Sequence, residues 1–565
     1  MKRIISVLLG IGVAVSAGAQ NWQDAQLLSE NQYGGTARGM AMGNALTAVG
    51  GDPASLTLNP AGSAVSAYTQ FFITPGLSVS VLSAKGITIP EGGTDPVGLG
   101  NQESTGRVRM KLPSVGFILN LDKGRRSGWK RSAFSFVVNS TADYTSRFRA
   151  SGLNSTTSYA ASLASSADGF QADVLGSGDW FYNGDNPALR PAWADMAGYR
   201  AGMFNGITGR PGGYVAITEV VGEDGKVYMG EPLQQVFNVE TTGGKHDFLI
   251  NYAANYNDIL YLGANLGITW LRYNRSQFFQ EMPDNPDDYP AANYADGSSA
   301  RLDYLRMQEN LRLSGAGVYF KAGILLRPVA GLRLGAAIQT PTVITLRERY
   351  WYDAEVHATG RYLPTASSPE NDWGYKLSTP FRVNAGLAYS FGQYVILSAD
   401  YEMADYGAAR FRSMDYTYDP LSDPNFSGVN QDIRDLMDLS HQVRVGLEVK
   451  PVSWLALRAG YNYLTSGEVA YFNGNNLQPL SDAQKAAKAK HTASFGVGWT
   501  SGSFFADVAV RTRFVPVEYY IPYEYYYAPN PAQFYNKVVD ESFLTPEIAV
   551  KSILVDAMFT IGWRF

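Results

Sequence analysis

The sequence predicts an all-β protein, a closed antiparallel transmembrane β-barrel of about fourteen strands. Three observations predict it. The composition is rich in Gly (58 residues) and Tyr (36 residues), and only 17% of residues are charged, a turn-rich and aromatic-rich balance that favours strands over helices. Many short segments alternate between apolar and polar residues. The connections between these segments alternate between short and long, as barrel topology requires.

The last segment, "ILVDAMFTIGWRF", shows the alternation most clearly. Its apolar face carries Ile561, Trp563 and Phe565, whereas the intervening residues are polar or small. In other segments the second face is dominated by Gly, Ser, Thr, Asn and isolated charges, the lining expected of a barrel interior. Aromatic residues gather at strand ends, as interfacial girdles do: Trp270, Tyr389, Phe391, Trp499, Trp563 and Phe565. The apolar faces are therefore expected to meet lipid.

Fourteen strands are expected, separated by alternating connections. Their ranges are 71–83, 108–121, 131–149, 245–257, 259–273, 311–327, 331–348, 376–391, 393–414, 438–450, 453–466, 488–500, 503–516 and 551–565. An even strand number places both chain ends on the short-turn, periplasmic side. The longest connection, about 150–244, is expected to be an ordered extracellular loop with some helix, and a separate domain is the alternative.

The first residues indicate export. Residues 1–19 combine Lys2 and Arg3 with an apolar run and small residues at Ala17 and Ala19, which predicts a secretory signal peptide. Removing Lys2 and Arg3 takes the formal charge from −5 to −7, which does not suggest nucleic acid as a partner. No later apolar run is long enough for a spanning helix. An exported, helix-poor membrane protein of this kind belongs in the bacterial outer membrane.

Enzymatic and metal-dependent functions are disfavoured. The chain has no Cys and four His residues, and the His residues are scattered singly. Thiolate chemistry is thereby excluded, and paired His ligands for zinc are missing. No nucleophile signature accompanies a His residue. We therefore expect no catalytic residues, no metal and no cofactor.

Residues 20–67 do not alternate like strands. The stretch "GGTARGMAMGNALTAVGGDPASLTLNPAG" is rich in Gly and Ala and contains two turn signals. The stretch has too few large apolar residues to face lipid, and its side chains are too small to form a hydrophobic core of their own. It is expected to fold into the lumen as a plug, with residues 68–565 forming the barrel.

The sequence resembles the FadL/TodX family of outer-membrane transporters for long-chain fatty acids and other hydrophobic compounds. The resemblance rests on "ARGMAMGNALTAVGGDPASLTLNPAG", on the strand count and on the C-terminal aromatic residue. It implies a fourteen-stranded barrel with an N-terminal hatch, whose Asn-Pro-Ala motif falls on Asn59, Pro60 and Ala61. It also implies that the ligand leaves sideways, through a gap made by an inward kink of the third strand. The long loops differ from the family pattern, so no loop residue is assigned to the ligand.

The third strand, "SAFSFVVNSTADYTSRF", offers a position for such a kink. Its outward apolar residues Phe134, Phe136 and Val138 give way to Ser140 and Ala142. The candidate kink comprises Asn139, Ser140, Thr141, Ala142 and Asp143. An ordinary strand running into the loop region is the alternative interpretation.

Charged residues on the predicted lumen face allow two interpretations. They are Lys321, Arg333, Arg382, Asp400, Glu402, Arg444, Glu448, Arg458, Asp507 and Arg511. A cation among them could hold a carboxylate head group, with Arg382 as the first candidate. A network of mutually satisfied charges is the simpler interpretation. The Tyr-rich stretch at 514–535 suits either an interfacial girdle or a capture groove.

The sequence thus predicts passive, hatch-gated uptake of a hydrophobic small molecule. The expected partners are that ligand, outer-membrane lipid and, through Phe565 on the last strand, the barrel-assembly machinery. The alternative on the same fold is a scaffold subunit that holds secreted or surface proteins. A lumen with a ligand-sized pocket and a side opening would favour transport, whereas a lumen packed shut would favour the scaffold.

Overall fold

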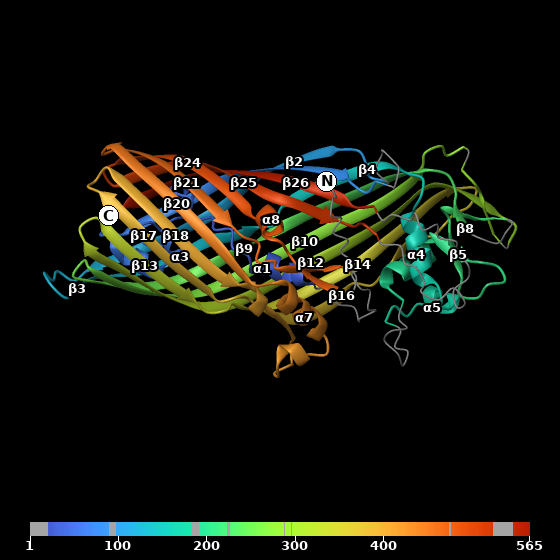
Figure 1. The fold of residues 1–565 in the computed structure, drawn as a ribbon, viewed down its shortest axis with the longest axis horizontal. Helices are drawn as coiled ribbons and strands as arrows, with labels where there is room; N and C mark the ends of the chain where they lie inside the picture. The colour runs from blue at the N-terminus through green and yellow to red at the C-terminus, as the bar shows by residue number, and fades with distance from the viewer. Residues whose placement is uncertain are drawn as a thin grey trace.

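A computed structural model describes residues 21–89, 98–181, 191–222, 227–287, 289–294, 296–473, 476–523 and 546–565. The predicted signal peptide therefore lies outside the described residues, as do Tyr525, Tyr526 and Tyr527 of the Tyr-rich stretch. Most described residues belong to one antiparallel sheet (Figure 1). Within the described ranges no helix combines the length and apolarity that crossing a bilayer demands.

The sheet closes into a barrel of fourteen strands, as predicted. The final strand pairs with the first from Gln70↔Arg564 to Gly86↔Ile548, which closes the sheet on itself. Four of the barrel strands are interrupted and carry two labels each. In order around the barrel the strands are β1 (Gln70–Gly86), β2 (Glu103–Asp122), β3 (Trp129–Asp143) with β4 (Ser146–Asn154), β9 (Leu233–Tyr256), β10 (Leu260–Pro283), β12 (Ser299–Val329), β13 (Leu332–Gln339) with β14 (Val343–Thr359), β17 (Arg382–Phe391) with β16 (Asn371–Ser378), β18 (Val395–Asp405) with β19 (Arg410–Ser413), β20 (Leu439–Val452), β21 (Leu455–Leu464), β24 (Lys490–Ser501), β25 (Phe504–Tyr520) and β26 (Ile548–Arg564).

The two faces of the strands have the predicted orientation. On β26, Ile553, Phe559 and Trp563 are exposed outward, whereas Asp556 and Thr560 are buried inside. The exposed apolar residues recur on all sides of the barrel and form the lipid-facing belt of a transmembrane barrel. The chain is therefore an outer-membrane β-barrel, and the apolar face of its last segment meets lipid.

The wall of the barrel has very unequal height. The longest strand, β12, has 31 residues, whereas β21 has 10, about the length that one membrane crossing needs. Figure 1 shows β9, β10, β12 and β14 projecting far beyond the rest at the end opposite the C-terminus. The short turns lie at the C-terminal end, which in bacterial barrels is periplasmic.

The connection between β4 and β9 forms a compact outer domain against this tall wall. Its elements are α4 (Tyr159–Ala167), α5 (Ala172–Gly176), α6 (Trp193–Ala201), β5 (Phe204–Gly206), β6 (Tyr214–Ala216), β7 (Glu219–Val221) and β8 (Val227–Met229). Buried Leu163, Met196 and Phe204 share one apolar cluster with Leu305 and Met307 of β12. The domain thus packs on the inner face of the wall and shares its core.

The remaining short elements lie in the outer loops. They are β11 (Ala292–Asn293), β15 (Ala366–Ser367), η3 (Tyr406–Ala408), η4 (Pro420–Ser422), α7 (Ser427–Leu436), β22 (Ala470–Asn473), β23 (Asn476–Pro479) and α8 (Asp482–Ala487). Ile433 of α7 and Phe426 just before it pack with Phe411 and Tyr375 of the wall.

The outer domain contains a buried acid that makes its stability depend on pH. Burial raises the pKa of Asp195 on α6 to about 7, although Ser166 Oγ donates a hydrogen bond of 2.8 Å to its carboxylate. The unfolded chain has a pKa of about 3.9 at this residue. Because the folded form holds this proton more tightly, the contribution of Asp195 to the stability of the domain is fully present below pH 4 and is lost as pH rises to 7.

Replacing Asp195 with Asn is therefore expected to stabilise the outer domain above pH 7, by about 4 kcal/mol at most. Asn keeps an acceptor for Ser166 and never ionises. Limited proteolysis of the domain at pH 5 and pH 8 measures the effect: the pH 8 rate should fall to the pH 5 rate. Asp173→Asn, at an exposed acid on α5, is the matched control. A pH effect that persists in the Asp195 variant contradicts the assignment.

Candidate functional site

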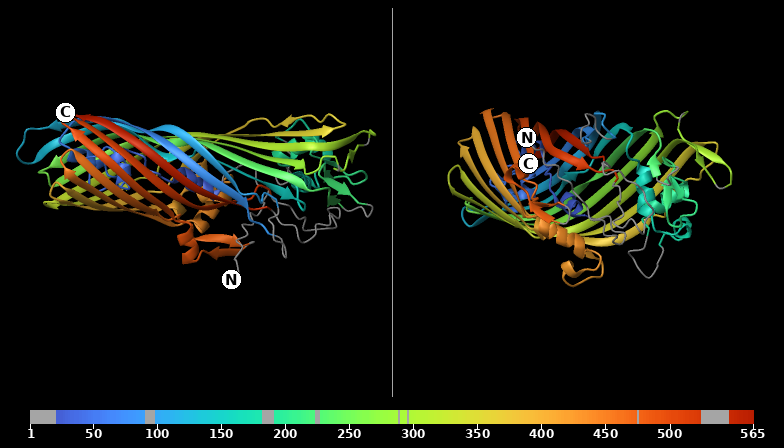
Figure 2. Two further views of the ribbon diagram at one scale, coloured as in Figure 1. Left: turned by 90° about the horizontal axis from the view of Figure 1, so that it is seen from above. Right: turned by 45° about the vertical axis from the view of Figure 1, so that its right-hand side comes forward.

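The N-terminal segment, residues 21–65, lies inside the barrel rather than in its wall. It forms α1 (Trp22–Ser29), α2 (Ala37–Ala41), α3 (Ser55–Leu58) and the 3-10 turn η1 (Pro60–Val65), seen in dark blue within the half of the barrel nearest the C-terminus (Figure 2). Short helices suit a Gly- and Ala-rich sequence with frequent caps. Thr36, for example, caps α2 by accepting a hydrogen bond of 3.0 Å from the Gly39 amide.

The Asn-Pro-Ala motif joins two parts of this segment to the wall. The Asn59 side-chain amide donates to Thr47 O at 2.8 Å and to Ile324 O of β12 at 2.9 Å. Its carbonyl oxygen accepts from the Ala61 amide at 3.1 Å and so caps η1, where Pro60 occupies the favoured first position. The motif is therefore a structural link between segment and barrel.

Inward-facing glycines on the wall form a seat for the segment. A Cβ atom at Gly323 would lie 2.1 Å from Asn59 Oδ1, and one at Gly460 would lie 2.0 Å from Gly43 N. No real Cβ makes such contacts, so only glycine lets the two backbones meet. The wall glycines within 3 Å of the segment by this criterion are Gly263, Gly323, Gly335, Gly386, Gly446, Gly460 and Gly496. They occupy seven different strands of the barrel.

Lumen charges hold the segment in this seat. Lys321 donates to Thr57 O at 2.7 Å, and Lys245 donates to Leu28 O at 2.9 Å. Asp400 accepts from the Thr47 amide at 2.7 Å, and Glu448 pairs with Arg38 at 2.8 Å. Several predicted lumen charges thus satisfy backbone groups that would otherwise be buried without partners. This arrangement agrees with the second interpretation of those charges, a network of mutually satisfied groups.

Arg382 lies within the same network. Its guanidinium pairs with Glu402 at 2.8 Å and donates to Ser29 O at 2.6 Å. Glu402 also pairs with Arg444 and accepts from Tyr33 Oη at 3.0 Å. A ligand carboxylate would have to compete with Glu402 for Arg382. A head-group role for Arg382 stays a prediction.

The candidate kink coincides with the end of pairing between β2 and β3. The last pair toward the outer end is Ser114↔Asn139, and β3 has a register shift against β9 between Ser140 and Ala142. Beyond this point the N-terminal segment replaces β2 as the partner of β3. The Gln32 amide donates to Thr141 O at 2.6 Å, and the Gly34 amide donates to Ser140 O at 2.9 Å.

A gap in the backbone ladder follows from this loss of pairing. We call the stretch without ladder pairs between β2 and β3/β4 the side window; it is bounded by Ser114↔Asn139 below and the bridge Asn101↔Ser151 above. Side chains span it: Arg109 pairs with Asp143 at 3.1 Å. Two further pairs, Arg107–Glu240 at 2.6 Å and Arg149–Glu103 at 3.6 Å, lie farther out.

The outer lip of the window is apolar and faces lipid. Met110 of β2 is 82% exposed, and Val108 and Leu112 are exposed beside it. All three share the outward face of β2. On β2 the side window therefore borders the lipid-facing belt.

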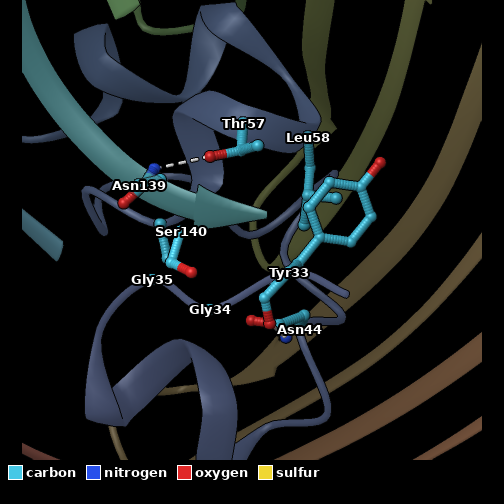
Figure 3. A pocket seen from close by; sticks show the side chains of 9 residues that line it. Tyr33, Gly34, Gly35, Asn44, Thr57, Leu58, Asn139 and Ser140 are labelled. Carbon is cyan, nitrogen blue, oxygen red and sulfur yellow. Dashed lines mark hydrogen bonds between the residues drawn. The ribbon is translucent and has the colours of Figure 1, made fainter. Parts of the chain in front are cut away.

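A small pocket lies between the N-terminal segment and the side window. Figure 3 shows Tyr33, Gly34 and Asn44 facing Asn139 and Ser140 across it. The Asn139 side chain donates to Thr57 Oγ1 at 2.6 Å. A second pocket beside Arg382 and Glu402 has a volume of about 10 Å³, room for one water molecule. Neither pocket is large enough for a hydrophobic ligand in this state.

Sequence reasoning missed three parts of this site. The sequence showed that the inward face of the strands is rich in Gly. It did not show which of these glycines contact the N-terminal segment. Gln32 and Gly34 carried no signal. The third part is an aromatic cluster on the inner face above the window, in which Phe148, Phe237 and Phe279 pack with Tyr523 of the Tyr-rich stretch.

Comparisons with known proteins give matches among solved structures alone. No protein-family model and no curated protein matches the chain. A FadL homologue of Pseudomonas aeruginosa is 14% identical with a TM-score of 0.46, covering 93% of this chain and 98% of that chain. The toluene transporter TodX of Pseudomonas putida is 14% identical with a TM-score of 0.45, covering 95% and 100%. The toluene transporter TbuX of Ralstonia pickettii is 12% identical with a TM-score of 0.44, covering 94% and 98%. At these values we draw neither residue roles nor a substrate from the likeness.

Proposed function

We propose that the barrel takes up hydrophobic small molecules, long-chain fatty acids or similar compounds, by passive diffusion through the side window into the membrane. The observation that carries the proposal is the missing ladder between β2 and β3 above Ser114↔Asn139, opposite an apolar outward lip. Backbone groups of a barrel wall are normally all paired. A gap maintained at membrane depth is a costly feature that a closed structural barrel does not need.

Lateral exit suits an apolar ligand energetically. Each CH₂ group that enters water loses about 0.8 kcal/mol of burial. The transfer of a long acyl chain into the aqueous periplasm is therefore strongly unfavourable, whereas transfer into the bilayer keeps the chain in an apolar environment. No energy source or cofactor is required for movement down a concentration gradient.

The N-terminal segment is the proposed gate. It covers the inner side of the window, because Gln32 and Gly34 bond to Thr141 and Ser140 of the kink. Release of these two bonds would open a path from the lumen to Met110 and Leu112 at the lip. In this proposal Asn139 to Asp143 form the exit, and Arg382 becomes a head-group site if a ligand carboxylate displaces Glu402.

Cross-linking the window is expected to abolish uptake. Because the chain has no Cys, Leu112→Cys with Ser140→Cys gives a unique thiol pair on the two lips, which a bis-maleimide can join. Uptake of radiolabelled oleate by host cells that lack another route should fall to the level of cells without the barrel. Leu119→Cys with Phe134→Cys is the matched control, since these residues are paired in the closed part of the same seam.

Two results would count against the proposal in different ways. Equal loss of uptake in the control pair, or full uptake by the cross-linked window pair, would exclude the lateral route. Absence of oleate uptake by the unmodified barrel would remove transport itself.

A scaffold for surface or secreted proteins is the second candidate function. It is favoured by the packing around the N-terminal segment, where both pockets described above are too small for a hydrophobic ligand. It also accounts for the outer domain and the tall wall. A barrel that takes up no oleate and purifies with an externally bound protein would support this function.

A further inference from the structure

The outer surface of the tall wall carries a group of cations that transport does not use. They lie on β10, β12, β14, β16 and β19, which are neighbours in the sheet. We call them the basic patch: Arg272, Arg312, Arg347, Arg349, Lys376 and Arg412.

Strand register brings these cations together on the outward face. Arg312 lies directly opposite Arg349 and Lys376 directly opposite Arg412. Arg347 is two residues from Arg349 and lies opposite Ser314. Since side chains two residues apart share a face, Arg312 points the same way as lipid-facing Val318 on its strand.

The basic patch sits at the edge of the apolar belt. Arg272 follows exposed Trp270 by two residues on β10, and Arg347 follows exposed Val343 by four on β14. Aromatic residues such as Trp270 mark the level where lipid head groups begin. The cations therefore lie at head-group height, directly above the acyl chains.

Acidic residues neutralise only part of the basic patch. Arg347 pairs with Asp372, and Arg349 lies 3.5 Å from Asp372 and 3.7 Å from Glu370. The nearby Asp353 is bonded instead by Trp351 and Ser367. Among the described residues no carboxylate forms an ion pair with Arg272, Arg312, Lys376 or Arg412.

Arg312 is the clearest cation in the described chain without an acidic partner. Its guanidinium stacks on Trp351 at 4.7 Å from the ring centroid, which orients its donors without supplying an acceptor. Like charges directly opposite each other in a sheet destabilise it, and Arg312 faces Arg349. A bound anion with several oxygens would remove this repulsion and accept from both guanidinium groups.

We propose that the basic patch binds the phosphorylated head group of an anionic lipid, whose acyl chains lie on the belt formed by Val318, Phe320 and Val343. The charge supplies the affinity for phosphate, and the adjoining apolar surface selects a lipid over a free anion. The side window lies on other strands, so this site anchors and orients the barrel in its leaflet independently of transport.

Native mass spectrometry of the folded barrel in detergent tests the site, with phosphatidic acid and phosphatidylcholine as competing probes. One phosphatidic acid should remain bound in preference to phosphatidylcholine. The double variant Arg312→Gln with Arg412→Gln should lower that preference about tenfold, since each basic residue near a membrane surface contributes to anionic lipid affinity. Neither residue has an acidic partner in the part of the chain that the structure describes, so the barrel should still fold, as heat-modifiable gel migration will verify.

The matched control is Lys85→Gln with Lys551→Gln, which removes two exposed outward cations from β1 and β26. This variant should keep the lipid preference of the parent. An equal loss of the preference for phosphatidic acid in both double variants would mean that any exposed cation contributes to lipid binding. That result would overturn the proposal. Displacement of the bound lipid by millimolar inorganic phosphate would show a free-anion site and overturn it as well.

Discussion

Replacing Gly460 with Val is expected to unseat the N-terminal segment and make the barrel leak. A Cβ at this position would lie 2.0 Å from Gly43 N and 2.3 Å from the Met42 carbonyl carbon. Both atoms belong to backbone, which cannot move aside like the end of a flexible side chain. The barrel itself should persist, because its ladder on both sides of β21 does not involve the segment.

Liposome swelling with a small neutral sugar measures this leak, and the variant should swell several-fold faster than the parent. Gly206→Val is the control, since Gly206 lies in the outer domain with open space around its Cβ position. A folded Gly460 variant that stays as tight as the parent would mean that the segment does not close the lumen.

Replacing Glu402 with Ala is expected to destabilise the closed barrel by about 3–5 kcal/mol, the cost of breaking a buried ion pair. Glu402 pairs with Arg382 and Arg444, and accepts from Asn384 at 2.8 Å. Its removal leaves two buried guanidinium groups facing each other. Both cations also border the N-terminal segment, so the leak measured above should rise with the loss of stability.

Urea unfolding of the folded barrel in detergent measures the change. Glu370→Ala removes an acid from an exposed pair with Arg349, where the expected cost is about 0–1 kcal/mol. Comparable losses in the two variants would contradict a central role for Glu402. Changing Arg382 and Arg444 to Met together with Glu402→Met should recover much of the stability, because the two guanidinium groups are then removed together with the carboxylate that pairs them.

The strand pattern was predictable because lipid imposes it. Alternation located all fourteen strands, but it understated β12, predicted at 311–327 and observed at Ser299–Val329. Beyond the belt the outward face becomes polar, with Gln308 and Asn310 in place of apolar residues. The period-two signal fades there although the strand continues on its hydrogen bonds.

The candidate site was predictable only where it changed a local pattern. Ser140 and Ala142 interrupt an outward apolar series, and the β2–β3 ladder ends beside them at Asn139. The exit function of these residues stays a proposal. The glycine seat gave no such signal, since Gly323 and Asn59 are distant in sequence and only the folded barrel shows which glycine faces which residue of the segment.

The unequal wall changes how the protein meets its surroundings. Beside β21 the rim ends near the membrane, whereas β12 continues for about twenty residues more, roughly 70 Å along the strand. The outer opening of the barrel is therefore oblique and faces the side of the short strands. A solute that approaches along the membrane surface from the side of β12 therefore meets this wall, with the outer domain packed on its inner face, before it reaches the lumen.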